Sequence, residues 1–262
     1  MMNTIRQPAV AGTFYPSDPD ELRGMLQGFL QDAHPPATVP KAMILPHAGY
    51  IYSGPVAASG YACLRGHRDA FSRIVLLGPA HRVPFRGIAA PSATSFMTPL
   101  GPVAIDRDAI DRLIPLPQVH VLDEAHRLEH SLEVHLPFLQ VSLGEFALVP
   151  LVIGEAGAGD VCEVIETLAS DAGTLVIISS DLSHYHDYAT ARELDAATTR
   201  KIEALDYDSL GYDQACGRNP VSGLLLYAQR HGLSATTLDT RNSGDTAGPH
   251  DQVVGYGAYV FS

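Results

Sequence analysis

Three histidines of this chain, His47, His81 and His184, each stand shortly after a run of four apolar residues. Such short apolar runs, closed by Pro or Gly, are typical of buried parallel strands. In open α/β sheets, ligands bind in the crevice beyond the carboxyl ends of the strands. Imidazole nitrogens bind iron, copper, zinc and nickel, and imidazole also moves protons near neutral pH. We therefore expect the three side chains to face one polar cleft.

Cys216 is a further candidate ligand. It lies in a tight turn, ACGRNP (215–220), directly before an expected helix. Because a helix N-terminus lowers the pKa of a thiol, we expect a thiolate that ligates or reacts, with ordinary packing as the alternative. Cys63 and Cys162 lie among apolar residues in helical patterns and are expected to be buried packing residues.

Asp181 and His184 follow the third apolar run. In one interpretation Asp181 orients a metal-bound histidine while His184 moves protons. In the other, they cap the helix that follows. A dense run of Glu and His lies within residues 123–143, where leucines at i, i+4 spacing predict a helix with His130 and Glu133 on one face. That polar face either belongs to the site or is merely solvated.

The remaining pattern alternates strands with helices. Helices are expected at 18–31, 56–64, 106–114, 160–172, 188–205 and 220–231, and strands at 42–45, 73–77, 87–90, 146–153, 174–179, 234–239 and 253–261. Residues 95–105 resemble a hairpin that adds an antiparallel part to the sheet, and residues 6–16 an arm on that sheet. The pattern predicts an α/β fold, with residues 1–262 forming a single three-layer α/β/α domain around a mostly parallel, mixed central sheet.

Composition excludes several function classes. The formal net charge is -12 and no Lys/Arg-rich block occurs, which argues against nucleic acid as a partner. No secretory signal and no apolar run of membrane-spanning length is found, so we expect a cytoplasmic protein with no membrane partner. Neither a Gly-rich phosphate loop nor a GxSxG elbow is present.

Six ordered motifs along nearly the whole chain resemble the Memo family, called AmmeMemoRadiSam system protein B in bacteria and archaea and mediator of ErbB-driven motility in animals. The motifs are AGTFY (11–15), PHAGY (46–50), GPAH (78–81), EHSLEVHLP (129–137), SSD with His184 (179–184) and CGRNP (216–220). The resemblance implies a fold similar to class III extradiol ring-cleaving dioxygenases, which use non-haem Fe(II) to open catechols. Those enzymes hold iron with two histidines and a carboxylate.

The resemblance also implies residue roles. In Memo proteins a cysteine replaces the carboxylate, and the matching positions here are His47, His81 and Cys216. The position of the proton-transfer histidine matches His184, with Asp181 beside it, and we add His130 to these two as a catalytic residue. From the same motifs we expect Tyr50, Glu133 and Arg218 to contact a substrate. Two residues depart from animal members, which carry histidine where this chain has Arg82 and Asn219.

Three hypotheses follow for the function. The first is an Fe(II)-dependent oxidoreductase that acts on a small phenolic or catechol-like molecule, with copper or zinc as the alternative metal. The second is a non-catalytic iron- or copper-binding redox protein, which soft thiolate ligation favours. The third is a peptide-binding module that uses the same cleft. The family name also implies a radical SAM enzyme and an AMMECR-type protein as partners.

Overall fold

A mixed sheet forms the middle layer of the protein in a computed structural model that describes residues 4–34 and 39–262. Its strands run in the order β10 (His184–His186), β12 (Val253–Phe261), β2 (Ala42–Leu45), β9 (Thr174–Ser179), β3 (Arg73–Pro79), β8 (Ala147–Ile153), β4 (Ile88–Ala90) and β7 (Val119–Val121), and β11 (Ala235–Asn242) pairs with β12. The strands β2, β9, β3 and β8 are parallel neighbours. Their carboxyl ends therefore meet at one edge of the sheet.

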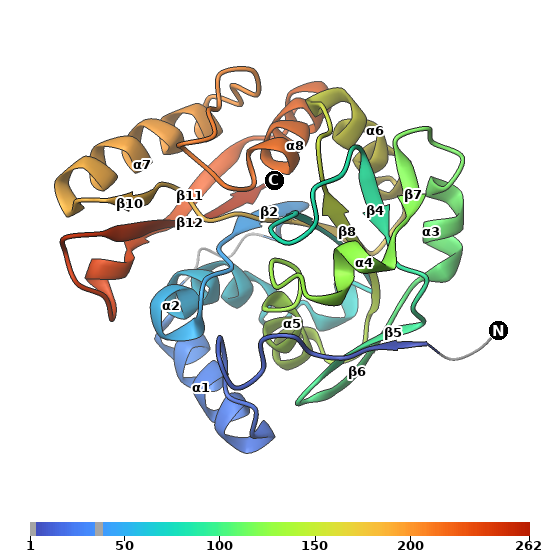
Figure 1. The fold of residues 1–262 in the computed structure, drawn as a ribbon, viewed down its shortest axis with the longest axis horizontal. Helices are drawn as coiled ribbons and strands as arrows, with labels where there is room; N and C mark the ends of the chain where they lie inside the picture. The colour runs from blue at the N-terminus through green and yellow to red at the C-terminus, as the bar shows by residue number, and fades with distance from the viewer. Residues whose placement is uncertain (1–3, 35–38) are drawn as a thin grey trace.

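Helices cover both faces of this sheet (Figure 1). The first group is α1 (Pro19–Asp32), α2 (Tyr50–Tyr61) and α5 (His135–Leu143), and the second is α3 (Arg107–Leu113), α6 (Ala158–Ala169), α7 (Tyr188–Glu203) and α8 (Arg218–His231). In the view of Figure 1, α1, α2 and α5 lie below the central strands, and α6, α7 and α8 lie above them. The predicted three-layer α/β fold is confirmed.

The central strands are buried because helices cover them on both sides. Every residue of β2 is buried, and β3, β8 and β9 each leave only their first residue partly exposed. Near-continuous apolar runs of this kind are expected of parallel strands. Their side chains join those of the covering helices in one apolar core. This core fixes the strand ends from which the site is built.

The predicted hairpin forms, but it does not join the main sheet. Strands β5 (Ser95–Thr98) and β6 (Gly101–Ala104) pair with each other, and β5 also pairs with β1 (Ile5–Arg6) in a separate small sheet. Of residues 6–16, the predicted arm on the main sheet, Arg6 belongs to this small sheet, whereas Val10 and Tyr15 lie in the apolar core that the main sheet shares. The mixed character of the main sheet comes instead from β4, β10, β11 and β12.

The polar segment 123–143 is also not one helix. It consists of α4 (Asp123–Arg127) and α5, joined by a non-helical stretch that contains both His130 and Glu133. The carboxylate of Glu129 explains the break, because it accepts the backbone N–H groups of His130 and Ser131 at 3.0 Å each. A side chain that bonds its own neighbouring backbone in this way competes with helix formation. The predicted shared helix face was therefore wrong.

Helix α2 begins at Tyr50, six residues before its predicted start, and continues into a 3-10 turn, η1 (Ala62–Leu64). Two more 3-10 turns are η2 (Arg68–Ala70) and η3 (Ser243–Asp245). Across the described residues, no helix combines the length and the apolar character that crossing a bilayer requires.

Candidate metal centre

His47 and His81 lie two residues beyond the ends of β2 and β3, on either side of β9. Their ring centroids are 5.1 Å apart. Cys216 reaches the same point from the turn before α8, with its Sγ 3.4 Å from His47 Nε2. Nitrogen or sulfur atoms of all three side chains lie within 4.8 Å of one another. The structure therefore brings together the three predicted metal ligands.

A glycine lets the cysteine turn approach β9 so closely. A Cβ atom at Gly217 would lie 2.6 Å from the carbonyl oxygen of Ser179, which no real Cβ contact tolerates. The Gly217 N–H donates to Ser180 Oγ at 3.0 Å, and the Asp181 N–H points to Cys216 Sγ at 3.3 Å. The backbone of the turn thus fixes the sulfur against the end of β9.

Hydrogen bonds orient the ring of His47. Ser179 Oγ donates its only proton to the carbonyl oxygen of Ser131 at 2.6 Å, so it accepts from His47 Nδ1, also at 2.6 Å. The proton of neutral His47 is thereby placed on Nδ1, and Nε2 presents its lone pair toward Cys216. Fixing the tautomer through the outer nitrogen is how proteins orient imidazole ligands.

His81 is oriented in the same sense by Glu129. One carboxylate oxygen accepts His81 Nδ1 at 2.9 Å, and the other accepts the backbone N–H of His81 at 2.6 Å. Burial opposes ionisation of Glu129, but the hydrogen bond and the charge interaction with His81 win and lower its pKa to about 2. A carboxylate only accepts, so Nδ1 carries the proton and Nε2 of His81 is free to bind a metal.

Burial sets the protonation states of the other two ligands. His47 is fully enclosed, and burial followed by the neighbouring histidines lowers its pKa, so its ring is neutral at physiological pH. For Cys216, burial and then the negative charge of Asp181 raise the pKa of the thiol. The expected lowering by the helix N-terminus was therefore wrong, because desolvation of the thiolate outweighs the helix dipole at this half-buried sulfur.

Asp181 lies directly against this centre. One carboxylate oxygen accepts the backbone N–H of His47 at 2.8 Å, and the other lies 3.8 Å from His47 Nε2. Burial raises the pKa of Asp181 to about 6. The helix that follows, α7, has Asp187 as its N-cap, so the alternative interpretation of Asp181 as a helix cap was wrong.

His184 is half-buried in β10, and its Nδ1 lies 2.9 Å from the carbonyl oxygen of Leu182. A carbonyl only accepts, so Nδ1 carries the proton, and in the neutral form of the ring Nε2 keeps its lone pair. The next residue, Tyr185, has a φ of 60° and a largely exposed side chain. Left-handed backbone at a non-glycine residue is uncommon and gathers at functional sites.

His130 joins the two ligand histidines. Its ring centroid lies 4.7 Å from that of His81 and 5.5 Å from that of His47. Its Nδ1 is 3.3 Å from a Glu129 oxygen but makes no hydrogen bond within the described residues. Burial and then the charge of His81 lower its pKa to about 4. With His81 and Glu129 it forms a second group whose ligand atoms lie close together.

The three residues predicted to contact a substrate are placed differently. Tyr50 is buried, and its hydroxyl donates to the carbonyl oxygen of Val134 at 2.5 Å. Arg218 stacks on the ring of Tyr212, 3.4 Å from its centroid. The Glu133 side chain has no exposed surface. Tyr50 and Glu133 are thus engaged inside the protein, and Arg218 contacts an exposed tyrosine.

The oxygens of Glu133 are occupied by the N-terminal arm. They accept from the backbone N–H groups of Ala9 and Val10 at 2.7 and 2.9 Å, from Tyr15 Oη at 2.6 Å and from Arg6 Nη1. The role that the structure shows for Glu133 is to hold the arm against the loop that carries Glu129.

An open pocket of about 450 Å³ adjoins the centre. Its lining includes Ala80, Phe85, Tyr212, Cys216 and Asn219. Such a pocket is large enough for a single aromatic ring with substituents, and its walls offer apolar and amide surfaces. One ligand of the candidate metal centre is therefore exposed directly to a cavity of substrate size.

The residues fit a single metal ion. Two imidazoles and a thiol suit iron, copper or zinc, and the hydrogen bonds at Nδ1 leave Nε2 of each ring for the metal. Bond lengths of about 2.0 to 2.3 Å give donor separations of roughly 3.3 to 3.6 Å around a four-coordinate ion, which the 3.4 Å between Cys216 and His47 matches. His81 is the most exposed of the three, with 29% of its side-chain surface accessible, so the site opens on its side.

Sequence reasoning missed the residues that orient the ligands. Glu129, Ser131 and Ser179 lie in motifs recognised in the sequence, but none was given a role. Glu129 lies 48 residues from His81, and Ser179 lies 132 residues from His47. No sequence motif connects a serine or a glutamate to a histidine over such distances. These contacts can be recognised only once the fold shows which strand ends lie side by side.

Comparisons with known proteins give a consistent result. The sequence profile described as Memo-like protein matches residues 6–260. A MEMO1 family protein of Saccharolobus solfataricus is 37% identical over 98% of this chain and 99% of its own length. One from Sulfolobus acidocaldarius is 35% identical over 96% and 97%. An uncharacterized protein from Escherichia coli K12 of known crystal structure is 14% identical, with a TM-score of 0.49 over 85% of this chain and all of its own.

Proposed function

The chain belongs to the Memo family, and we propose that it binds one metal ion through His47, His81 and Cys216 and oxidises a small phenolic molecule beside it. Fe(II) is the metal we propose, with copper or zinc as alternatives. When bound, non-haem iron would supply the redox chemistry between dioxygen and the phenol that no side chain of this site can supply.

The observation that carries the metal assignment is the orientation of the two imidazoles. Ser179 and Glu129 each occupy Nδ1 of one histidine and leave Nε2 for a metal, and ligand atoms of both rings and of Cys216 lie within 4.8 Å of one another. His47 is buried and His81 is partly exposed, so burial alone does not explain why both rings are held in this way. The thiol of Cys216 at 3.4 Å from one Nε2 completes a soft donor set.

The residues around this donor set support catalysis. His184 has a free Nε2 and can take the proton of a phenol hydroxyl as general base. The pocket beside Cys216 would hold the ring, with Phe85 and Tyr212 as its aromatic walls. Arg218 stiffens Tyr212 from behind through the stacked guanidinium. Each role is local and can be removed by one substitution.

A second candidate is a metal-binding redox protein without a substrate. Cys216 favours it, because a cysteine sulfur among the ligands selects Cu(I) and other soft ions. In that case the same three side chains would bind the metal, and His184 would have no effect on its chemistry.

Metal content and turnover separate these functions. Anaerobically purified protein is expected to hold about one metal ion per chain, and His47→Ala and Cys216→Ser are expected to lose it. Cys63→Ser, which changes a buried cysteine outside the centre, serves as the matched control. His184→Ala should keep the metal and lose ring opening of a catechol panel under dioxygen. Metal bound by the same residues without reaction toward any phenol would favour the redox protein, and equal metal content in all variants would refute the site.

A further inference from the structure

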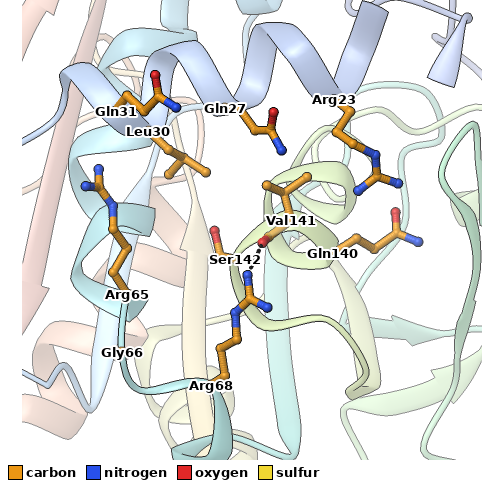
Figure 2. A pocket seen from close by; sticks show the side chains of 10 residues that line it. All are labelled: Arg23, Gln27, Leu30, Gln31, Arg65, Gly66, Arg68, Gln140, Val141 and Ser142. Carbon is orange, nitrogen blue, oxygen red and sulfur yellow. Dashed lines mark hydrogen bonds between the residues drawn. The ribbon is translucent and has the colours of Figure 1, made fainter. Parts of the chain in front are cut away.

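A second pocket lies between α1, the segment that joins η1 to η2, and α5 (Figure 2). Its volume is about 550 Å³, and we call it the arginine pocket because Arg23, Arg65 and Arg68 line it. The segment that carries Arg65 and Arg68 leads into β3, and α5 leads into β8. The pocket is therefore beside the amino ends of the parallel strands, whereas the candidate metal centre is at their carboxyl ends.

The charges of the arginine pocket are not compensated. Among the described residues, its lining contains three arginines and no carboxylate, in a chain with 29 acidic and 17 basic residues. Arg6, Arg73 and Arg127, by contrast, each form an ion pair with an acidic side chain. Within the described part of the chain, none of the three pocket arginines forms such a pair. A concentration of free positive charge on an acidic protein attracts anions.

Two of the arginines have a partial structural explanation. Arg65 donates to the carbonyl oxygen of Ala33 at 3.2 Å, and Arg68 donates to that of Val141 at 3.2 Å, so both bind backbone at helix ends. Each uses one donor of the five that a guanidinium carries. Arg23 makes no hydrogen bond within the described residues, and Figure 2 shows its side chain directed toward the α5 side of the pocket. Helix capping therefore leaves most of the donors free and does not account for Arg23.

The floor of the pocket supplies a further donor. Ser142 on α5 is 6% exposed and lines the pocket, and its hydroxyl has no hydrogen-bond partner among the described residues. A buried hydroxyl without a partner carries a free-energy cost that a ligand atom can remove. Gln27 and Gln31 add amide groups on the α1 side, and Leu30 and Val141 add apolar surface. The site thus offers charged donors, neutral donors and an apolar wall together.

We propose that the arginine pocket binds a phosphate group carried by a small organic molecule. The planar guanidinium donates two parallel hydrogen bonds to phosphate oxygens, and a phosphate monoester carries close to two negative charges at neutral pH. The volume exceeds that of a bare phosphate ion, and Leu30 and Val141 give the organic part a surface to pack on. This site shares no lining residue with the pocket beside Cys216, so its ligand does not occupy the proposed active site.

Calorimetric titration tests the proposal with three probes: inorganic phosphate, phenyl phosphate and benzoate. We expect saturable binding of phenyl phosphate, weaker binding of inorganic phosphate and no binding of benzoate. Arg23→Gln is the main variant, because Arg23 forms no side-chain hydrogen bond or ion pair with the described residues that the substitution would remove, and it should weaken phenyl phosphate binding about tenfold or more. Arg200→Gln removes an exposed arginine of α7 outside the pocket and serves as the charge-matched control.

His47→Ala separates this site from the metal centre and should bind phenyl phosphate as tightly as the unaltered protein does. Binding of inorganic phosphate as tight as that of phenyl phosphate would show a free-phosphate site and overturn the organic part of the proposal. Equal affinities in Arg23→Gln and Arg200→Gln, equal binding of benzoate, or no saturable heat with either phosphate probe would overturn it altogether.

Discussion

Replacing Glu129 by glutamine tests the argument that ligand orientation determines metal binding. The two carboxylate oxygens accept four hydrogen bonds, two from His81 and one each from the backbone of His130 and Ser131. A glutamine keeps one oxygen. If that oxygen takes the position of Oε1, it still accepts from His81 Nδ1 and from the backbone of His130 and Ser131. The new NH₂ group then faces the backbone N–H of His81, and two donors oppose each other.

The loss can be estimated from these contacts. Supporting residues of metal-bound histidines are typically worth about 10- to 100-fold in metal affinity. That range is about 1.4 to 2.8 kcal/mol, similar to the cost of about 1 to 3 kcal/mol for a buried donor without an acceptor. If the side-chain amide were flipped, its NH₂ group would face Nδ1 of His81. It would then favour the tautomer that carries its proton on Nε2 and cannot bind metal through that atom, so the metal affinity would fall in this case too.

The assay is competition for Zn²⁺ against a chromophoric chelator, with unfolding by urea to show that the variant is folded. Glu124→Gln is the control, because it removes the same charge from an exposed pair with Arg127 on neighbouring α4. We expect Glu129→Gln to bind metal about 10- to 100-fold more weakly and the control to bind as the unaltered protein does. A folded Glu129→Gln protein with unchanged affinity would refute the reasoning, since His81 would then need no support.

Two further predictions concern stability. Glu133→Gln should lower the free energy of unfolding by about 3 to 5 kcal/mol, because it leaves the buried guanidinium of Arg6 without its carboxylate; an unchanged urea midpoint would contradict this. Burial lowers the pKa of His126 to about 4 and of His135 to about 3. Below pH 6.5 the unfolded chain therefore binds protons that the folded chain does not, and urea midpoints should fall from pH 6.5 to pH 3, less steeply in His135→Gln.

The sequence predicted the strands that are marked by a long apolar run of their own. The bounds of β9 and β12 agree with the expected strands at 174–179 and 253–261, because long apolar runs are buried wherever a sheet is covered on both faces. Strand β10 was missed, since its three residues are polar or aromatic and pair only with the distant β12. Short strands of this kind depend on partners rather than on their own composition.

The candidate site was predictable to a similar extent. His47, His81 and Cys216 were found because strand ends and a family resemblance point to them, and the structure brings their ligand atoms together. The protonation of Cys216 was not predictable, because a local rule about helix ends ignores the depth at which the turn is buried. The helical interpretation of His130 and Glu133 failed likewise, because long-range hydrogen bonds from the N-terminal arm and His81 hold that loop.

The bond between Arg6 and Glu133 has a consequence for how the protein forms during translation. The two residues are 127 positions apart, so a ribosome that adds about 5 to 20 residues per second makes Glu133 roughly 6 to 25 seconds after Arg6. During that interval the arm has no carboxylate to bind. Cys216 is added later still, 169 positions after His47. A nascent chain that has not reached Cys216 therefore lacks one of the three proposed ligands, so the proposed metal could bind to all three only after most of the chain has been synthesised.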